Sequence, residues 1–478
     1  MIDTKALRSR ILDLAIQGKL TEQLESDGTA EELYQQIQAE KQALIKEGKI
    51  KKEKPLPPIS TDEIPFEIPS NWKWVCLQDI AYLTSGSQYE EIDEGIPYIK
   101  VADMNLDSNL YEIRTSTRFV SESNNGIIPI SSIIFPKRGG AILTNKKRIV
   151  SITPVFIDSN TMAMTLFVSD MLLFIKHWFD SIDLGELHTG TSIPQINNKD
   201  LYPLIIPLPP LAEQKRIVER VEEIFRLLDT IDKAQEKYSA DLQILKAKLI
   251  TAGIQGKLTK QLESDGTAQE LYQQIQEEKQ KLIKEGKLKK EKPLPPISPD
   301  EIPFEIPQNW MWVRFGTIAD MLSGFAFKSQ DFKKMGKYRL LRGINLGVNS
   351  IRWDDTVFVD NIQDKHSDYK LECGDVILGL DRPWISNGTR VAIYNNNEET
   401  YLVQRVLRVR GFGYLLNTFI ALILNSPLLK NPIGEYTTGI SVPHISPNQV
   451  GSIIVPLPPL AEQKRIADVL ERVLGVVE

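Results

Sequence analysis

From residue 16 to residue 75 the chain reads IQGKLTEQLESDGTAEELYQQIQAEKQALIKEGKIKKEKPLPPISTDEIPFEIPSNWKWV. From residue 254 to residue 313 it reads IQGKLTKQLESDGTAQELYQQIQEEKQKLIKEGKLKKEKPLPPISPDEIPFEIPQNWMWV. The two segments agree at about 52 of 60 positions, far more than a shared composition could produce. A shorter segment, PLPPLAEQKRI, also occurs twice, at residues 207–217 and 456–466. Two copies predict a pseudo-twofold molecule, because a solenoid needs at least about three repeats.

The repeated segments follow a circular order. In the middle of the chain, PLPPLAEQKRI continues through a helical stretch into IQGKL. At the ends the same unit is split, because residues 456–478 close the chain and residues 1–75 open it. A symmetric fold would bring the two termini together.

A long helix is predicted after the first PLPPLAEQKRI. Apolar residues recur there in steps of mostly three and four, at Ile217, Val221, Ile224, Leu228, Ile231, Tyr238, Leu242, Leu245 and Leu249. This heptad spacing is typical of a coiled coil, although Gln235 interrupts it. Similar spacing from Ile466 to Val477 and from Leu7 to Leu14 predicts a broken second helix, antiparallel to the first.

Two unlike segments lie between the repeats, at residues 76–206 and 314–455. Their β-rich runs and Gly, Asn and Pro punctuation predict mixed α/β or mostly β domains. The fold class is therefore α+β, with two globular domains separated by a long antiparallel two-helix coiled coil. The predicted segments are helical residues 1–54, domain 55–206, spacer 207–292, domain 293–455 and helix 456–478.

Composition excludes several classes of protein. The 478 residues are 42% hydrophobic and 25% charged, which is ordinary for a globular chain. Two cysteines, no apolar leader and no run long enough to span a bilayer indicate a cytoplasmic protein without membrane contact. The net charge of -6, taken alone, argues mildly against a nucleic-acid partner.

No catalytic or cofactor motif is visible. The chain has no Walker A sequence, no G-x-G-x-x-G after a strand and no G-x-S-x-G. Its four histidines lack metal-ligand spacing with each other or with the cysteines. The sequence therefore predicts a non-catalytic chain that carries no cofactor and no metal.

Clusters of cations and amides are candidates for contact with an anionic partner. In the first domain these are Lys137, Arg138, Asn145, Lys146, Lys147 and Arg148. In the second they are Lys328, Arg342, Asn345, Arg382, Trp384, Asn387 and Arg390. Arginine and lysine can bond a guanine edge and asparagine an adenine edge, whereas an ordinary charged hairpin is the alternative for the first set.

Further repeated features have two interpretations each. The lysine runs at residues 49–54 and 287–292 are either solvated helix ends or phosphate contacts. The Thr-Gly turns that open residues 189–196 and 438–445 are either structural turns or backbone contacts to phosphate.

The chain resembles the specificity subunit of a type I restriction-modification system. The resemblance is carried by the doubled PLPPLAEQKRI, by IPxNWxWV at residues 68–75 and 306–313, and by SGFAFKS at residues 323–329. It covers essentially the whole chain in the same order. It does not indicate which DNA bases are recognised.

The resemblance implies a non-catalytic subunit with two target-recognition domains. Each domain would read one half of a split, asymmetric double-stranded DNA target from the major groove, and the helices would set the spacing. The implied partners are two methyltransferase subunits, which methylate adenine, and restriction subunits with motor and nuclease activity, together forming a phage defence. S-adenosylmethionine, ATP and magnesium would belong to those partners. A self-sufficient DNA-modifying enzyme and a scaffold for proteins only are the alternatives.

Overall fold

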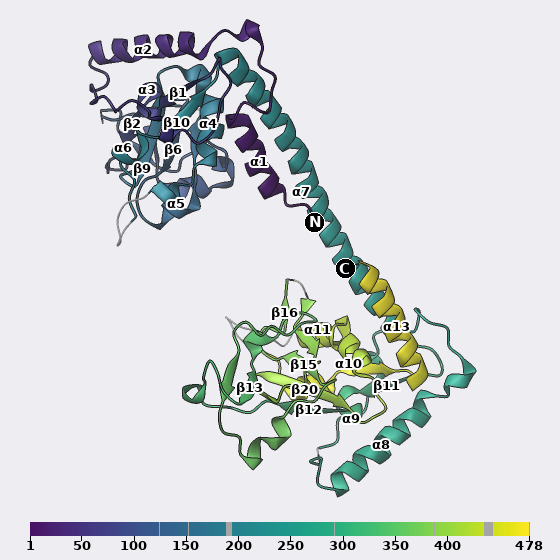
Figure 1. Cartoon of the computed structure of the whole chain (residues 1–478). Helices are drawn as coiled ribbons and strands as arrows, with labels where there is room; N and C mark the ends of the chain where they lie inside the picture. Colours follow the sequence, from purple (N-terminus) through teal and green to yellow (C-terminus); the bar gives the residue numbers. More distant parts are fainter. Residues whose placement is uncertain are drawn as a thin grey trace. The chain divides into compact units, whose positions relative to one another are not determined.

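In the computed structural model the chain forms two compact units, Met1–Glu236 (unit 1) and Lys237–Glu478 (unit 2). The structure describes residues 1–123, 125–151, 153–187, 194–290, 292–386, 388–434 and 443–477. Both units mix helices and strands, as the sequence predicts (Figure 1). Within the described residues, no helix has the length and apolar character that crossing a membrane requires.

Unit 1 is built on a mixed sheet with strand order β2-β9-β6-β7-β4. These strands are β2 (Ala81–Ser85), β4 (Glu112–Ile113), β6 (Ser132–Pro136), β7 (Arg148–Val150) and β9 (Thr161–Leu166). A second sheet has the order β5-β3-β8, with β3 (Ile96–Ile99), β5 (Phe119–Val120) and β8 (Phe156–Ile157). The helices are α1 (Thr4–Ile16), α2 (Ala30–Lys46), α3 (Leu77–Ile80), α4 (Leu172–Ser181), α5 (Leu184–Leu187), α6 (Asn198–Leu201) and the first part of α7 (Leu211–Ile254).

Unit 2 has a related arrangement, with a sheet of order β12-β20-β15-β18 and another of order β14-β13-β19. The strands are β12 (Ala319–Ser323), β13 (Tyr338–Leu341), β14 (Val357–Val359), β15 (Val376–Gly379), β18 (Val391–Ile393), β19 (Thr400–Leu402) and β20 (Val406–Gly411). Besides the end of α7, the helices are α8 (Ala268–Lys284), α9 (Phe315–Ile318), α10 (Asn417–Leu424), α11 (Pro427–Gly434), α12 (Pro447–Ser452) and α13 (Leu460–Val477).

The central strands of each main sheet are buried on both faces. Every residue of β6, β9 and β15 is buried, so these strands do not alternate between buried and exposed residues. In unit 1, α4 packs against this sheet, with the rings of Phe179 and Phe135 5.0 Å apart. Burial of both faces makes these sheets the rigid base from which the connecting loops project.

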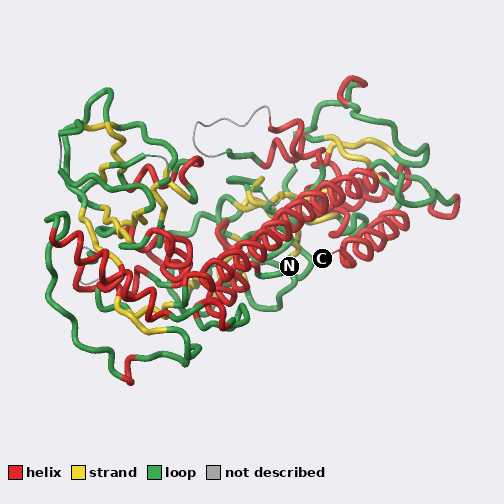
Figure 2. The backbone as a smooth tube through the Cα atoms, turned by 90° about the horizontal axis from the view of Figure 1, so that it is seen from above, coloured by secondary structure: helices red, strands yellow, loops and turns green. Residues whose placement is uncertain are grey.

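The helix α7 is continuous over 44 residues (Figure 2). In unit 1, α1 lies antiparallel to it, with Thr4 Oγ1 bonded to Asp232 at 2.5 Å and Arg8 paired with Asp229 at 2.6 Å. In unit 2, α13 lies antiparallel to its last turns, and a side chain at Gly253 would lie 3.3 Å from Leu470. The predicted pairing of one long helix with helices from both chain ends is confirmed.

The predicted apolar face of the long helix is buried along only part of its length. Ile217, Val221 and Leu228 are buried, but Tyr238 and Leu245 are 59% and 44% exposed. The heptad spacing predicts which residues share a helix face, and it cannot indicate where the partner helix stops.

The repeated segments contact each other inside each unit. In unit 1, the indole Nε1 of Trp72 donates to the buried Glu213 at 2.8 Å, and Gln23 donates to the same carboxylate at 2.9 Å. In unit 2, Trp310 and Gln261 each donate to Glu462 at 2.8 Å. The IPxNW segment is thereby fastened to the AEQKR segment in both units.

Two further features complete this repeated frame. Arg216 pairs with Asp27 at 2.6 Å, and Arg465 pairs with Asp265 at 2.5 Å. The strands β1 (Lys73–Cys76) and β10 (Ile205–Leu208) are antiparallel partners, as are β11 (Met311–Arg314) and β21 (Ile454–Leu457). In each unit the repeated sequence therefore joins the start and the end of the unlike segment, residues 76–206 or 314–455.

Candidate nucleic-acid interface

In unit 1, the predicted basic segment begins in the loop after β6. The amide of Lys137 donates to the carbonyl of Asn160 at 2.8 Å, and the carbonyl of Lys137 accepts from the amide of Ile196 at 2.9 Å. The amide of Gly139 donates to Pro194 at 2.9 Å, and Arg138 forms an isolated β-bridge with Gln195. The loop is therefore held by backbone bonds, while the side chain of Arg138 is exposed.

The second half of this segment is largely occupied within the domain. Asn145 has a positive φ of 50°, and its Oδ1 accepts from the amide of Leu184 at 3.1 Å. Lys146 contacts Asn105, and Arg148 donates to the carbonyl of Asn109 at 2.8 Å. Lys146 and Arg148 stay partly exposed, and the Asn145 amide has a structural partner.

Lys147, one of the predicted nucleic-acid contacts, lies inside the domain. Lys147 is only 2% exposed, and its ammonium group donates to the carbonyls of Phe179 and Ile182, the latter at 2.6 Å. Burial lowers the pKa of Lys147 to about 7. Because these carbonyls lie at the C-terminal end of α4, Lys147 completes the end of that helix instead.

In unit 2, Arg382 occupies a corresponding loop after β15. Its amide donates to the carbonyl of Pro443 at 2.7 Å, its φ is 45°, and its side chain is exposed. The neighbouring carboxylate of Asp381 accepts from Arg405 at 2.7 Å and contacts Nδ1 of His444 at 2.6 Å. Although burial raises the pKa of Asp381, the bonds from Arg405 and His444 lower it below its ordinary value.

A short hairpin of β16 (Trp384–Ile385) and β17 (Gly388–Thr389) follows this loop. Trp384 is half-buried and packs against the core of unit 2, and its Nε1 has no bonding partner within the described part of the chain. Asn387 lies outside the described residues. Trp384 is thus mainly a support for the hairpin.

Asn345 and Arg390, two further predicted contacts, are bonded within their own domain. Asn345 is 2% exposed, and its side chain accepts from the amide of Arg342 and donates to the carbonyl of Arg352. The guanidinium of Arg390 donates to the carbonyls of Leu346 and Asp381, both at 3.0 Å. These groups satisfy buried backbone carbonyls, and charge composition alone could not distinguish that role from DNA contact.

The remaining predicted residues of unit 2 differ in exposure. Lys328 is exposed and follows the ring of Phe327, which lies 5.0 Å from the ring of His366. Arg342 donates to the carbonyl of Asp355 at 2.7 Å, and its side chain is partly exposed. Lys328 is free to meet a ligand, and Arg342 is partly committed to its own domain.

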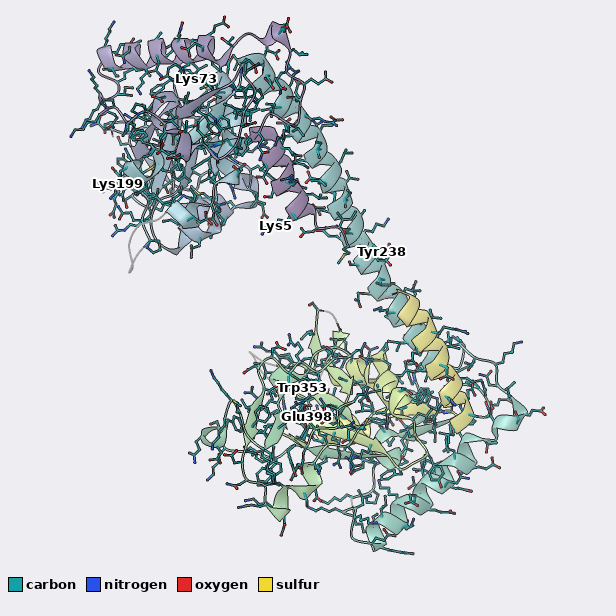
Figure 3. The ribbon with its side chains drawn as sticks, viewed as in Figure 1. Lys5, Lys73, Lys199, Tyr238, Trp353 and Glu398 are labelled. Carbon is teal, nitrogen blue, oxygen red and sulfur yellow. The ribbon has the colours of Figure 1, made fainter. Side chains whose placement is uncertain are left out.

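Other arginines of unit 2 act inside the fold. Arg339 lies over the ring of Trp353, 4.5 Å from its centroid, and pairs with Glu398; both partners are labelled in Figure 3. Arg408 is buried and pairs with Asp320 at 2.8 Å. Residues 314–455 contain 16 Lys and Arg against 13 Asp and Glu, but this basic balance overstates the positive charge that is available at the surface.

The fold also brings to these loops Arg405, whose alternation with Arg408 and Arg410 in the sequence favours an anionic partner, and three residues that sequence reasoning missed: Asn160, Gln195 and His444. Asn160 and Gln195 lie beside Arg138, whereas Arg405 and His444 lie beside Asp381. The signal that could have found Gln195 and His444 is Pro-x-Ile, which occurs at residues 194–196 and 443–445. The predicted Thr-Gly turns just before these tripeptides fall on residues 188–193 and 435–442, outside the described residues.

The described parts of the chain contain no group of three or more His, Cys, Asp or Glu residues arranged to hold a metal ion. The polar side chains at the loops are amides, arginines, a histidine and an aspartate. Such groups donate and accept hydrogen bonds, which is the chemistry that reads base edges.

Comparisons with known proteins match this architecture. A family model for the type I restriction modification DNA specificity domain matches residues 69–238 and 307–477, more than half of the chain. The type I restriction enzyme EcoAI specificity subunit of Escherichia coli is 32% identical, over 98% of this chain and 89% of its own. The EcoEI specificity subunit of the same species is 27% identical, over 98% of this chain and 88% of its own.

A solved structure shares the fold. It is described as "Structural basis underlying complex assembly and conformational transition of the type I R-M system". The likeness has a TM-score of 0.58 at 18% identity and covers 86% of this chain and 92% of the other. The two matched segments, the nearly full-length relatives and this fold lead to one conclusion: the chain belongs to the family of type I restriction-modification specificity subunits, non-catalytic proteins with two target-recognition domains.

Proposed function

We propose that the chain binds a bipartite, asymmetric double-stranded DNA target, with each unit reading one half from the major groove. The observation that carries the proposal is that two nearly identical frames hold two unlike domains. A repeated frame with variable loops suits one task performed twice on different ligands. Family membership supports the same assignment.

The exposed cations are the proposed contacts. Arg138, Lys328 and Arg382 are exposed, and the partly exposed Lys137, Lys146, Arg148 and Arg342 complete the set. Lysine and arginine supply the phosphate attraction and the guanine contacts in such interfaces. Because the whole chain carries a net charge of -6, basic partner subunits would supply the remaining attraction.

The proposed partners are two methyltransferase subunits and the restriction subunits. S-adenosylmethionine, ATP and magnesium would be bound by those partners and not by this chain, in the cytoplasm where the DNA lies. The chain passes from unit 1 to unit 2 within α7, so this helix would fix the spacing of the two half-sites.

The direct test is to sequence methylated adenines in DNA modified by the full chain assembled with its methyltransferase subunits. We expect two half-sites separated by unread base pairs. One continuous palindrome would contradict the two-reader proposal. Salt-dependent binding of the assembled complex to its target would separate this function from a protein-only scaffold, which binds no DNA.

A test of the charge argument compares two preparations. The isolated chain should bind a target duplex more weakly than the complex with its methyltransferase subunits, because the isolated chain is acidic. Equal affinities would reject the argument that the partners supply the missing positive charge.

A further inference from the structure

We infer that three equivalent backbone positions in each unit carry the side chains that set its base preference. They are Arg138, Asn160 and Gln195 in unit 1, and Asp381, Arg405 and His444 in unit 2. The inference rests on the proposed DNA-binding function and deepens it, because it assigns specificity to particular side chains. Asn160, Gln195 and His444 do not belong to any basic cluster in the sequence, whereas Arg405 alternates with Arg408 and Arg410.

The equivalence is established by matching backbone hydrogen bonds. The amide of Lys137 donates to Asn160 at 2.8 Å, and the amide of Leu380 donates to Arg405 at 3.0 Å. The carbonyl of Lys137 accepts from Ile196 at 2.9 Å, as that of Leu380 does from Ile445. These bonds place residue 160 and residue 405 at the same point of the fold.

The third position follows from the Pro-x-Ile segments. Arg138 forms an isolated β-bridge with Gln195, and Asp381 forms one with His444. The next residues in the loops, Gly139 and Arg382, donate to the carbonyls of Pro194 and Pro443. Three chain segments therefore converge in the same way in each unit.

One glycine in each unit, Gly86 or Gly324, packs closely against the segment that leads to the second of these positions. A Cβ on Gly86 would lie 2.1 Å from the carbonyl oxygen of Asp158, and one on Gly324 would lie 2.1 Å from that of Val403. No side chain fits at either place, so the backbone passes directly against the segment that leads into residue 160 or residue 405. The backbone contacts at these three positions are common to the units, and the side chains that they carry differ.

In unit 1 the outward groups suit purine edges. Asn160 donates from Nδ2 to Asp158 at 3.0 Å, and Gln195 donates from Nε2 to Asn197 at 2.9 Å. Each amide retains a second N–H and a carbonyl oxygen that no described residue bonds. An adenine edge presents a donor at N6 and an acceptor at N7 and is matched by such an amide, and Arg138 matches the guanine edge.

In unit 2 the outward groups form a connected cluster. Asp381 accepts from Arg405 and contacts His444, while the side chains of Arg405 and His444 are 67% and 48% exposed. The carboxylate therefore orients both side chains from one side and leaves their remaining donors toward solvent. Arg405 suits guanine O6 and N7, and Asp381 acts as the group that positions it.

The experiment selects bound sequences from a randomised double-stranded DNA library, using the full chain assembled with its methyltransferase subunits. The double variant Asn160→Ala with Gln195→Ala should reduce base preference about tenfold or more at positions in one half-site only. The variant Arg405→Ala should do the same in the other half-site only. Lys199→Ala, an exposed change on α6 of unit 1, should leave both halves unchanged.

The outcomes separate this inference from the proposed function. If the unmodified complex selects no sequence, the DNA-reading function fails. If it selects a split sequence and the variants leave both halves unaltered, the function stands and this inference is overturned. An alanine variant that loses all binding would not show which bases are read. In that case the reciprocal exchanges Gln195→His and His444→Gln, which keep a hydrogen-bonding group at each position, test whether these side chains set the base preference. Altered bases in the half-sites support the inference, and unaltered bases overturn it.

Discussion

At the scale of single residues, buried polar groups hold each frame together. Trp72 Nε1 and the Gln23 amide both donate to Glu213, whose residue is fully buried. Replacing Glu213 with alanine leaves an indole N–H without its acceptor inside the domain. The expected loss of unfolding free energy is about 1–3 kcal/mol for each group left unpaired.

The chain offers its own control for this prediction. Glu462→Ala removes the equivalent acceptor of Trp310 in unit 2. Hydrogen exchange measured by mass spectrometry on the full chain should show faster exchange around Trp72 for the first variant and around Trp310 for the second. Equal effects of both variants on both units would contradict the assignment of separate frames.

A second prediction concerns His177, whose two ring nitrogens have no partner within the described chain. Burial lowers its pKa from 6.5 to about 4, and its ring lies 6.1 Å from that of Phe225. Between these pH values the unfolded chain binds a proton that the folded chain does not bind. Stability therefore falls as the pH decreases from about 6.5 to 4.

Replacement of His177 by leucine should remove this dependence. The variant should gain stability relative to the unmodified chain on acidification, by an amount on the order of 3 kcal/mol near pH 4. Thermal unfolding of both proteins at pH 7.5 and pH 4.5 measures this difference in stability. An equal loss of stability in both proteins on acidification would show that other groups cause the pH dependence.

Residue types in the sequence predicted the cation-rich loop segments but not which cations face solvent. Arg138 and Arg382 are exposed, whereas Lys147, Asn345 and Arg390 bond backbone carbonyls inside their domains. The difference depends on which buried carbonyls lack a partner, and this is decided by tertiary contacts. A sequence pattern alone cannot supply that information.

At the scale of elements, the amphipathic helices α2 and α8 are the most complete copies of each other. Each begins with a capping box, at Thr29 and at Thr267, and each buries one isoleucine fully, Ile37 or Ile275. Ile37→Ala should cost about 2–5 kcal/mol and loosen α2 from its domain, because it opens a cavity in the contact.

The matched control is Gln36→Ala, which changes an exposed residue on the same turn of α2. Circular dichroism during thermal unfolding should show a lower midpoint for Ile37→Ala and an unchanged midpoint for the control. A similar midpoint for both variants would show that α2 contributes little through its buried face.

Predictability differed between helices and strands for a physical reason. The long helix α7 follows from local heptad spacing, which a few turns of sequence are enough to show. Strand pairing joins residues far apart in the sequence, such as Lys73 with Leu208, and the mixed order of β2-β9-β6-β7-β4 leaves no local trace. Fully buried strands also lack the alternation that would identify them.

At the scale of the whole molecule, the chain passes between its units within α7, at Glu236 and Lys237. Inserting one heptad there would lengthen this helix by about 10 Å. Under the proposed function the target should be lost or have a different spacer, while the bases of each half-site stay the same. Sequencing methylated DNA from cells that carry the variant tests this, and altered half-site bases would count against the role of α7.

The side chains that hold the repeated frame together are not the side chains that project from the loops at Arg138 and Arg382. Trp72 bonds Glu213 and Arg216 pairs with Asp27, whereas the loop at Arg138 is held by backbone groups. Exposed loop side chains such as Arg138 can therefore change without removing a bond of the frame. A lineage that carries this gene could acquire new recognition properties through a few nucleotide changes while retaining a functional assembly throughout.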